Sequence, residues 1–126
     1  MCQLFINAEA DNWVSRTKSL RIDGMATSLR MENFFWDLLD EIATRDGMTV
    51  NQLITKLYLE SLDAGHDTGN FTSFLRVCCA RYLALATEGE IRRGDPQPLA
   101  EVDAAGILER ETSRRAQARR EVSRMN

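Results

Sequence analysis

The sequence predicts a mainly α-helical fold in which a short β-strand precedes two helices. Three observations indicate this: apolar and polar residues alternate over residues 26–31, apolar residues recur at helical spacing over 34–45, and a helix-capping motif begins at residue 49. A lone strand leaves its backbone N–H and C=O groups unpaired, and such an edge invites another chain. We therefore expect an intertwined homodimer whose two-stranded antiparallel β-ribbon takes one strand from each subunit.

Residues 19–31 contain two similar alternating runs, SLRI and SLRM, with the dipeptide DG between them. The two runs could close as a hairpin within one subunit, or the first could be a lead-in to a single strand; we favour the second run as the core strand. In this run Leu29 and Met31 share one parity and are predicted to face the core, with Thr27 beside them. The other parity places three side chains on the outer face: Ala26, Ser28 and Arg30.

Two helices are expected after the strand. Asn33 is the predicted N-cap of the first, which extends from about residue 34 to 45, and Gly47 is its predicted stop. The second begins with the sequence TVNQ at residues 49–52, which has the pattern of a capping box, and continues to about residue 62. The apolar side chains at helical spacing on their inner faces are Phe35, Leu38, Leu39, Ile42, Ala43, Leu53, Ile54, Leu57 and Tyr58.

A third helix is expected after Asn70, in the run FTSFLRVCCARYLALA, and it completes a domain over residues 1–87. The composition then changes, because the segment RRGDPQP contains both prolines of the chain and is typical of a linker. We assign residues 88–126 to this linker and a polar tail that is either helical or disordered. The end of the tail is arginine-rich, with five arginines and one glutamate in residues 112–126.

The segment TSLRMENFFWDLLDEIATRDGMTVNQLI resembles the ribbon-helix-helix superfamily of bacterial repressors. It is especially similar to a subgroup that has TSLRMENFFW-like and GNFTSFLR-like motifs. The core of the resemblance covers about residues 26–62, and at the level of the subgroup it extends over roughly 1–85. It implies a ribbon-helix-helix fold, a homodimer and double-stranded DNA as the ligand, with no cofactor.

The resemblance also implies roles for particular residues. The outward strand residues Ala26, Ser28 and Arg30 would contact bases, because arginine can form a bidentate contact with guanine and serine can donate or accept. The helix start at Thr49, Val50 and Asn51 would hold a DNA phosphate through its free backbone N–H groups. The expected dimer core consists of Leu29, Met31, Phe35, Trp36, Leu39, Ile42, Leu53 and Leu57.

The function that follows from these expectations is sequence-specific transcriptional regulation, as a repressor in the cytoplasm. The net charge of −3 requires that any DNA contact be concentrated on a small face. The alternative is an antitoxin-like or adaptor dimer that binds a protein through the third helix or the tail. The three cysteines and single histidine have no metal-ligand spacing, so we expect no metal site, and no catalytic motif points to an enzyme.

Overall fold

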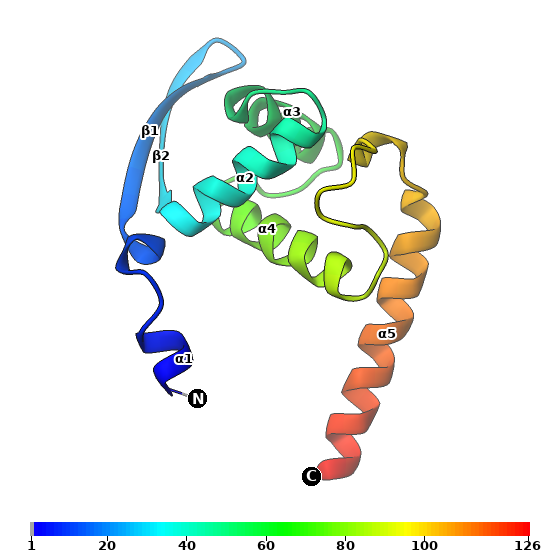
Figure 1. Ribbon diagram of the computed structural model, residues 1–126. Coiled ribbons are helices and arrows are strands. Elements are labelled where there is room, and N and C mark those ends of the chain that lie inside the picture. Colours follow the sequence, from blue (N-terminus) through cyan, green and yellow to red (C-terminus); the bar gives the residue numbers. More distant parts are fainter. Residues whose placement is uncertain (1) are drawn as a thin grey trace.

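The computed structural model describes residues 2–126, which form a small helical body with a two-stranded sheet on one side (Figure 1). In chain order the elements are α1 (Cys2–Ile6), a 3-10 helix (Ala10–Trp13), β1 (Ser15–Ile22), β2 (Met25–Glu32), α2 (Asn33–Arg45), α3 (Val50–Asp63), α4 (Phe71–Thr87), a second 3-10 helix (Leu99–Glu101) and α5 (Ala104–Met125). The strand followed by two helices is therefore confirmed. The first helix begins one residue earlier than expected, because Glu32 rather than Asn33 is its N-cap.

The two strands form an antiparallel hairpin within the chain, with Ser19 opposite Ser28 and Ile22 opposite Met25. Asp23 and Gly24 connect them, and both have positive φ angles, 51° and 80°. Two consecutive positive φ angles fit the tight two-residue turn whose twist matches paired strands, and Asp-Gly is a preferred sequence for it. The hairpin needs only this short turn to close, so the entropy cost of closing the loop is small.

This pairing corrects one prediction. We expected residues 26–31 to find their strand partner in a second subunit, whereas β2 pairs with β1 of the same chain. The physical reason is the Asp23-Gly24 turn, which makes the local partner available without a second molecule. The two similar runs thus form a hairpin, and β1 pairs with the edge of β2 that we expected a second subunit to cover.

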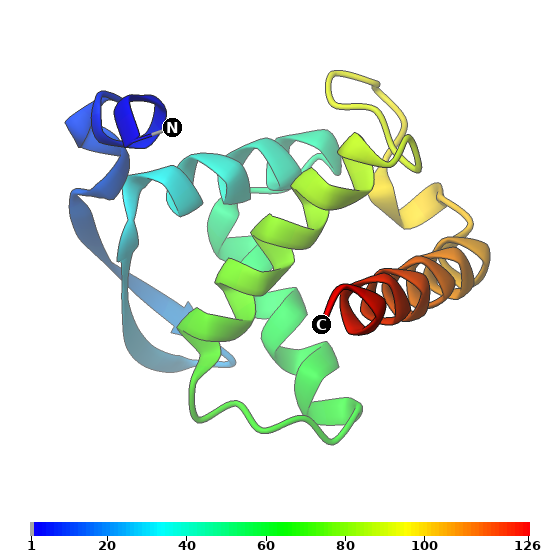
Figure 2. The same cartoon turned by 90° about the horizontal axis from the view of Figure 1, so that it is seen from below.

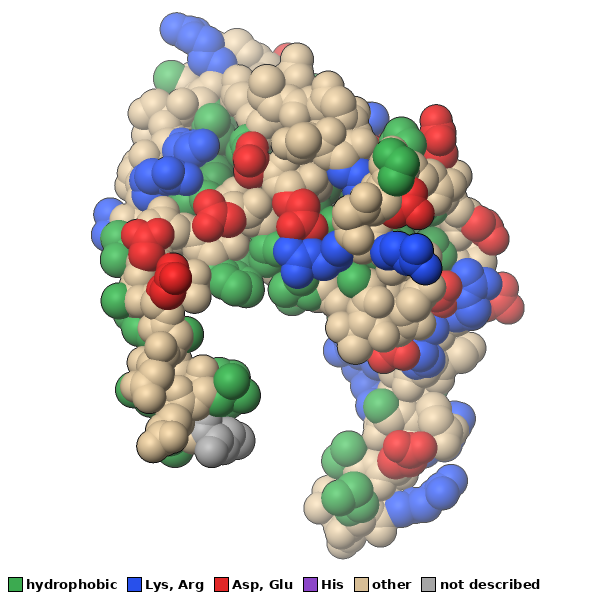
Figure 3. All heavy atoms as spheres, in the orientation of Figure 1, with side chains coloured by type: hydrophobic (Ala, Val, Ile, Leu, Met, Phe, Trp, Pro, Cys, Tyr) green, Lys and Arg blue, Asp and Glu red, His purple; other side chains and the backbone are tan. Residues whose placement is uncertain are grey.

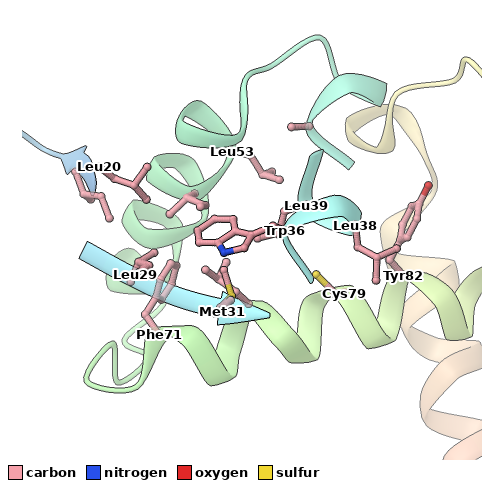
Figure 4. Packing of buried hydrophobic residues seen from close by; sticks show 14 of the residues in the cluster. Leu20, Leu29, Met31, Trp36, Leu38, Leu39, Leu53, Phe71, Cys79 and Tyr82 are labelled. Carbon is pink, nitrogen blue, oxygen red and sulfur yellow. The ribbon is translucent and has the colours of Figure 1, made fainter. Parts of the chain in front are cut away.

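The inner face of the hairpin packs on α2, α3 and α4 and forms one end of a continuous apolar core (Figure 4). Met31 and Leu39 have no exposed surface and Trp36 is 1% exposed, which makes them the centre of this core. The indole Nε1 of Trp36 donates to the Arg16 carbonyl oxygen at 2.9 Å and so fixes β1 against α2. The rest of the buried apolar set comprises Leu20, Ile22, Leu29, Leu38, Ala43, Leu53, Ile54, Phe71, Leu75, Cys79, Tyr82, Ile91 and Ile107.

The segment after α4 folds back along the end of α2 before α5 begins (Figure 2). Arg45 donates to the carbonyl oxygens of Gln97 and Arg92 at 2.7 and 2.8 Å, and the Asp46 carboxylate accepts from the backbone N–H of Leu99 at 2.7 Å. The division of the chain at residue 87 stays a prediction, but the segment that follows it is held by specific contacts.

The long helix α5 extends away from the body and is anchored near its N-terminal end (Figure 1). Ile107 is buried, and the Glu90 carboxylate accepts from Arg110 at 2.7 Å and from Arg114 at 3.0 Å. These two guanidinium groups lower the pKa of Glu90 to about 2, and the larger effect is that of Arg110. Glu90 therefore stays ionised at neutral pH and ties α5 to the end of α4. No helix in the described chain is both long and apolar enough to span a membrane.

Candidate nucleic-acid interface

The outer face of the hairpin is a small polar surface. Residues opposite each other in an antiparallel pair project from the same face, so the register groups Thr17 with Arg30, Ser19 with Ser28, and Arg21 with Ala26. All six of these side chains are exposed. The opposite face carries the buried Leu20, Ile22, Leu29 and Met31. The outer face thus offers two guanidinium groups and three hydroxyls on a ribbon two strands wide.

Lys18 is an inward residue of β1 that is held by an aromatic ring. Lys18 faces the body, where its Nζ lies 5.1 Å from the centre of the Trp36 ring. A cation over an aromatic face is attracted by the ring quadrupole, which keeps this charge off the outer face. Arg21 and Arg30 are therefore the exposed guanidinium groups of the outer face. Lys18 differs from them because it lies on the inner face and contacts an aromatic ring.

Glu32 is an acidic residue at the open end of this surface. Glu32 stands opposite Ser15 at the end of β2, and its carboxylate accepts from Arg76 of α4 at 3.0 Å. A backbone hydrogen bond and the contact with Arg76 lower the pKa of Glu32. The charge is thus compensated within the molecule. In Figure 3 Lys and Arg side chains lie on the hairpin side of the molecule, and basic and acidic side chains are interspersed along the segment after α4 and along α5.

The N-terminus of α3 is a second candidate contact. Its N-cap Thr49 accepts from the Gln52 N–H at 3.1 Å, and the Gln52 side chain accepts from the Thr49 N–H at 2.9 Å, so the predicted capping box is confirmed. Within the described chain, the N–H groups of Val50 and Asn51 have no hydrogen-bond partner. Two unpaired donors at a helix start, where the dipole is positive, favour an anion.

This helix start lies near the β1 edge of the hairpin. Thr55 of α3 has its hydroxyl oxygen 3.5 Å from the carbonyl oxygen of Arg21. Asn51 precedes Thr55 by one helical turn on the same face, a rise of roughly 6 Å along the axis. The free N–H groups therefore lie about one helical turn from a residue that contacts the β1 edge of the hairpin at Arg21.

A family model described as "Ribbon-helix-helix domain" matches residues 15–83, more than half of the chain. The chain belongs to the ribbon-helix-helix family. Domains of this family in general bind DNA and are typically non-catalytic. The resemblance to the ribbon-helix-helix superfamily that the sequence indicated is thus confirmed.

A solved structure is similar over most of this ribbon-helix-helix chain. It is described as an uncharacterized protein from Bordetella pertussis Tohama I, with 49% sequence identity and a TM-score of 0.78, and the match covers 85% of this chain and 86% of that one. No curated protein matches the chain significantly. The similarity therefore extends beyond the family core, to a neighbour without an assigned function.

The predicted base-contacting residues of this ribbon-helix-helix domain lie on the outer face, where Ala26, Ser28 and Arg30 are exposed. Their contact with DNA stays a prediction. Sequence reasoning missed the equivalent residues of β1, which are Thr17, Ser19 and Arg21. The signal that could have identified them is the repeat of KSLRI as TSLRM, because it gives both strands the same inward–outward pattern.

The predicted dimer-core residues lie in two environments. Leu29, Met31, Trp36, Leu39 and Leu53 are buried within the single chain. The remaining three, Phe35, Ile42 and Leu57, are partly exposed. Ile42 and Leu57 line an open apolar groove of about 470 Å³ between the helices and the segment after residue 98. Their role in a dimer stays a prediction. No group of three or more potential metal ligands is found within residues 2–126.

Proposed function

We propose that this protein is a sequence-specific DNA-binding transcriptional repressor that inserts the β1–β2 hairpin into the major groove. The observation that carries the proposal is the outer face of the hairpin, on which Arg21, Arg30 and three hydroxyl groups are exposed together. A two-stranded ribbon has its strands about 4.8 Å apart and fits a major groove about 12 Å wide. Arginine and serine are also residue types that read base edges there.

The helix start at Thr49, Val50 and Asn51 supports the proposal because it can position the hairpin on the duplex. Its two unpaired N–H groups suit a phosphate oxygen, and its proximity to Arg21 would place that phosphate beside the groove that the hairpin occupies. Such a contact carries no sequence information by itself. Base contacts from the hairpin would provide the specificity.

The direct test is binding of the full chain to duplex DNA, measured by fluorescence anisotropy with duplexes of about 30 base pairs at increasing salt. One duplex is selected from a random-sequence library and another has unrelated mixed sequence. We expect tighter binding to the selected duplex, and an affinity for both that falls steeply with salt as counterions are released. Failure to bind either duplex at low salt would reject the proposal and favour the adaptor-like protein-interaction function.

We also propose that the protein is a homodimer, because ribbon-helix-helix domains usually act on DNA as dimers. Support comes from apolar side chains that the single chain leaves open: Leu4, Phe5 and Ile6 of α1 are 75%, 62% and 73% exposed. Burial of such groups in a second copy would be favourable. Light scattering at micromolar concentration tests this, since a mass that stays at 14.3 kDa would contradict it.

Asn51→Asp should weaken binding to every duplex alike, because it places a carboxylate beside the predicted phosphate and leaves the base-reading face unchanged. The helix itself should form normally, since a negative charge in its first turn suits the dipole. Anisotropy on two duplexes of unrelated sequence and circular dichroism measure the two effects. Ser73→Asp is the matched control, as it adds the same charge to the exposed first turn of α4. Loss of affinity for one sequence only would contradict the phosphate role.

A further inference from the structure

The hairpin has an internal two-fold pseudosymmetry. The segment KSLRI at residues 18–22 is repeated as TSLRM at residues 27–31, and Ser19 stands directly opposite Ser28. Two antiparallel strands are related by a two-fold axis perpendicular to the sheet. An axis midway between Ser19 and Ser28 therefore superposes each position of the first segment on the corresponding position of the second. It relates Leu20 to Leu29 on the inner face.

On the outer face the same axis relates Arg21 to Arg30. The two arginines lie on opposite strands and at opposite ends of the polar surface, with Ser19 and Ser28 between them. Both are exposed. Their positions are about four residues apart along the ribbon, which corresponds to roughly 13 Å at about 3.3 Å per residue. A DNA strand rises about 3.4 Å per base pair, so this span matches about four base-pair steps.

We propose that Arg21 and Arg30 are an equivalent pair of base-reading residues, so that a single hairpin recognises a short inverted repeat. The expected target is two guanines, one on each DNA strand and about four base pairs apart, each contacted by one guanidinium group. A duplex has local two-fold axes that exchange its strands. A ribbon whose own axis coincides with one of them presents its two arginines to equivalent positions. This inference rests on the proposed function and adds the short DNA sequence that one hairpin reads.

Because of this pseudosymmetry, one chain supplies two equivalent arginines. In a ribbon shared between two subunits, two identical strands would supply them. The equivalence is incomplete at the ends of the hairpin. Arg21 lies next to the turn, where its Nη1 donates to the Gly24 carbonyl oxygen at 3.3 Å. A guanidinium group has five N–H donors, so this contact leaves a pair available for a base. It also holds Arg21 over the tip of the hairpin.

The experiment is selection of binding sites from a random library of about 30 base pairs with the full-length wild type, Arg21→Ala and Arg30→Ala. The wild type should enrich the inverted pair of guanines. Each substitution should relax the preference at one member of the pair and lower the affinity for the selected duplex by about tenfold to hundredfold. The affinity for a mixed-sequence duplex should change less. Arg16→Ala is the matched control, because Arg16 is also exposed on β1 but pairs with Met31 on the other face.

Arg21→Lys keeps the charge and loses the bidentate geometry, so it should retain non-specific binding and lose base preference. It serves as the second variant if thermal melting shows that Arg21→Ala destabilises the turn. If both Arg21 variants keep the wild-type site and affinity while Arg30→Ala changes them, the inference is overturned and the proposed function stands. DNA binding by the wild type without any enriched inverted pair has the same consequence. Absence of any DNA binding overturns both.

Discussion

Leu39→Ala should lower the free energy of unfolding by about 2–5 kcal/mol, the usual cost of removing a buried leucine side chain. Leu39 has no exposed surface and lies on the core face of α2 beside Trp36 (Figure 4). Truncation removes apolar contacts and leaves a cavity that the surrounding helices can only partly fill. A domain of this size is stable by only about 5–15 kcal/mol, so the effect is a large share of the total. Urea denaturation followed by circular dichroism measures it.

The matched control is Leu59→Ala in α3, which makes the same change at a side chain that is 37% exposed. It should cost less than about 1 kcal/mol, because substitutions outside the core have small effects on stability. Similar midpoints for the two variants would show that the face of α2 containing Leu39 is not the core of the protein in solution.

Arg30→Ala and Leu29→Ala should have opposite effects, although the residues are neighbours in β2. Arg30 is exposed on the outer face, so its removal should leave stability nearly unchanged and lower specific DNA affinity by about 1–3 kcal/mol for each bound hairpin. Leu29 is only 8% exposed on the inner face, so its truncation should destabilise the fold by about 2–5 kcal/mol. The difference follows from the alternation of side chains along a strand.

Paired measurements of melting temperature and of affinity for the selected duplex test this prediction. An unfolded Arg30→Ala variant together with a stable, binding-deficient Leu29→Ala variant would mean that the faces of the strand are inverted. If neither substitution changes DNA binding under conditions where both variants are folded, the hairpin is not the reading element. The protein-interaction function would then be favoured.

The sequence was sufficient for the features that depend on neighbours along the chain. The capping box at Thr49 and Gln52 was predicted because both partners lie within one helical turn. The inward position of Leu29 and Met31 followed from a period of two residues, which one strand displays by itself. The family resemblance was carried by the same segment, because the spacing of a strand, a helix, a glycine and a capped helix is local.

Tertiary structure decided which strand pairs with β2 and which groups share a surface. The local pattern was compatible with both a hairpin and a lone strand. The Asp23-Gly24 turn and the packing of β1 on α3 and of β2 on α2 selected the hairpin. That choice brought Arg21 onto the same face as Arg30 and placed β1 against Thr55 of α3. Alternation specifies the face of each residue within its own strand, whereas the partner and the register depend on the turn and on the core that the strands cover.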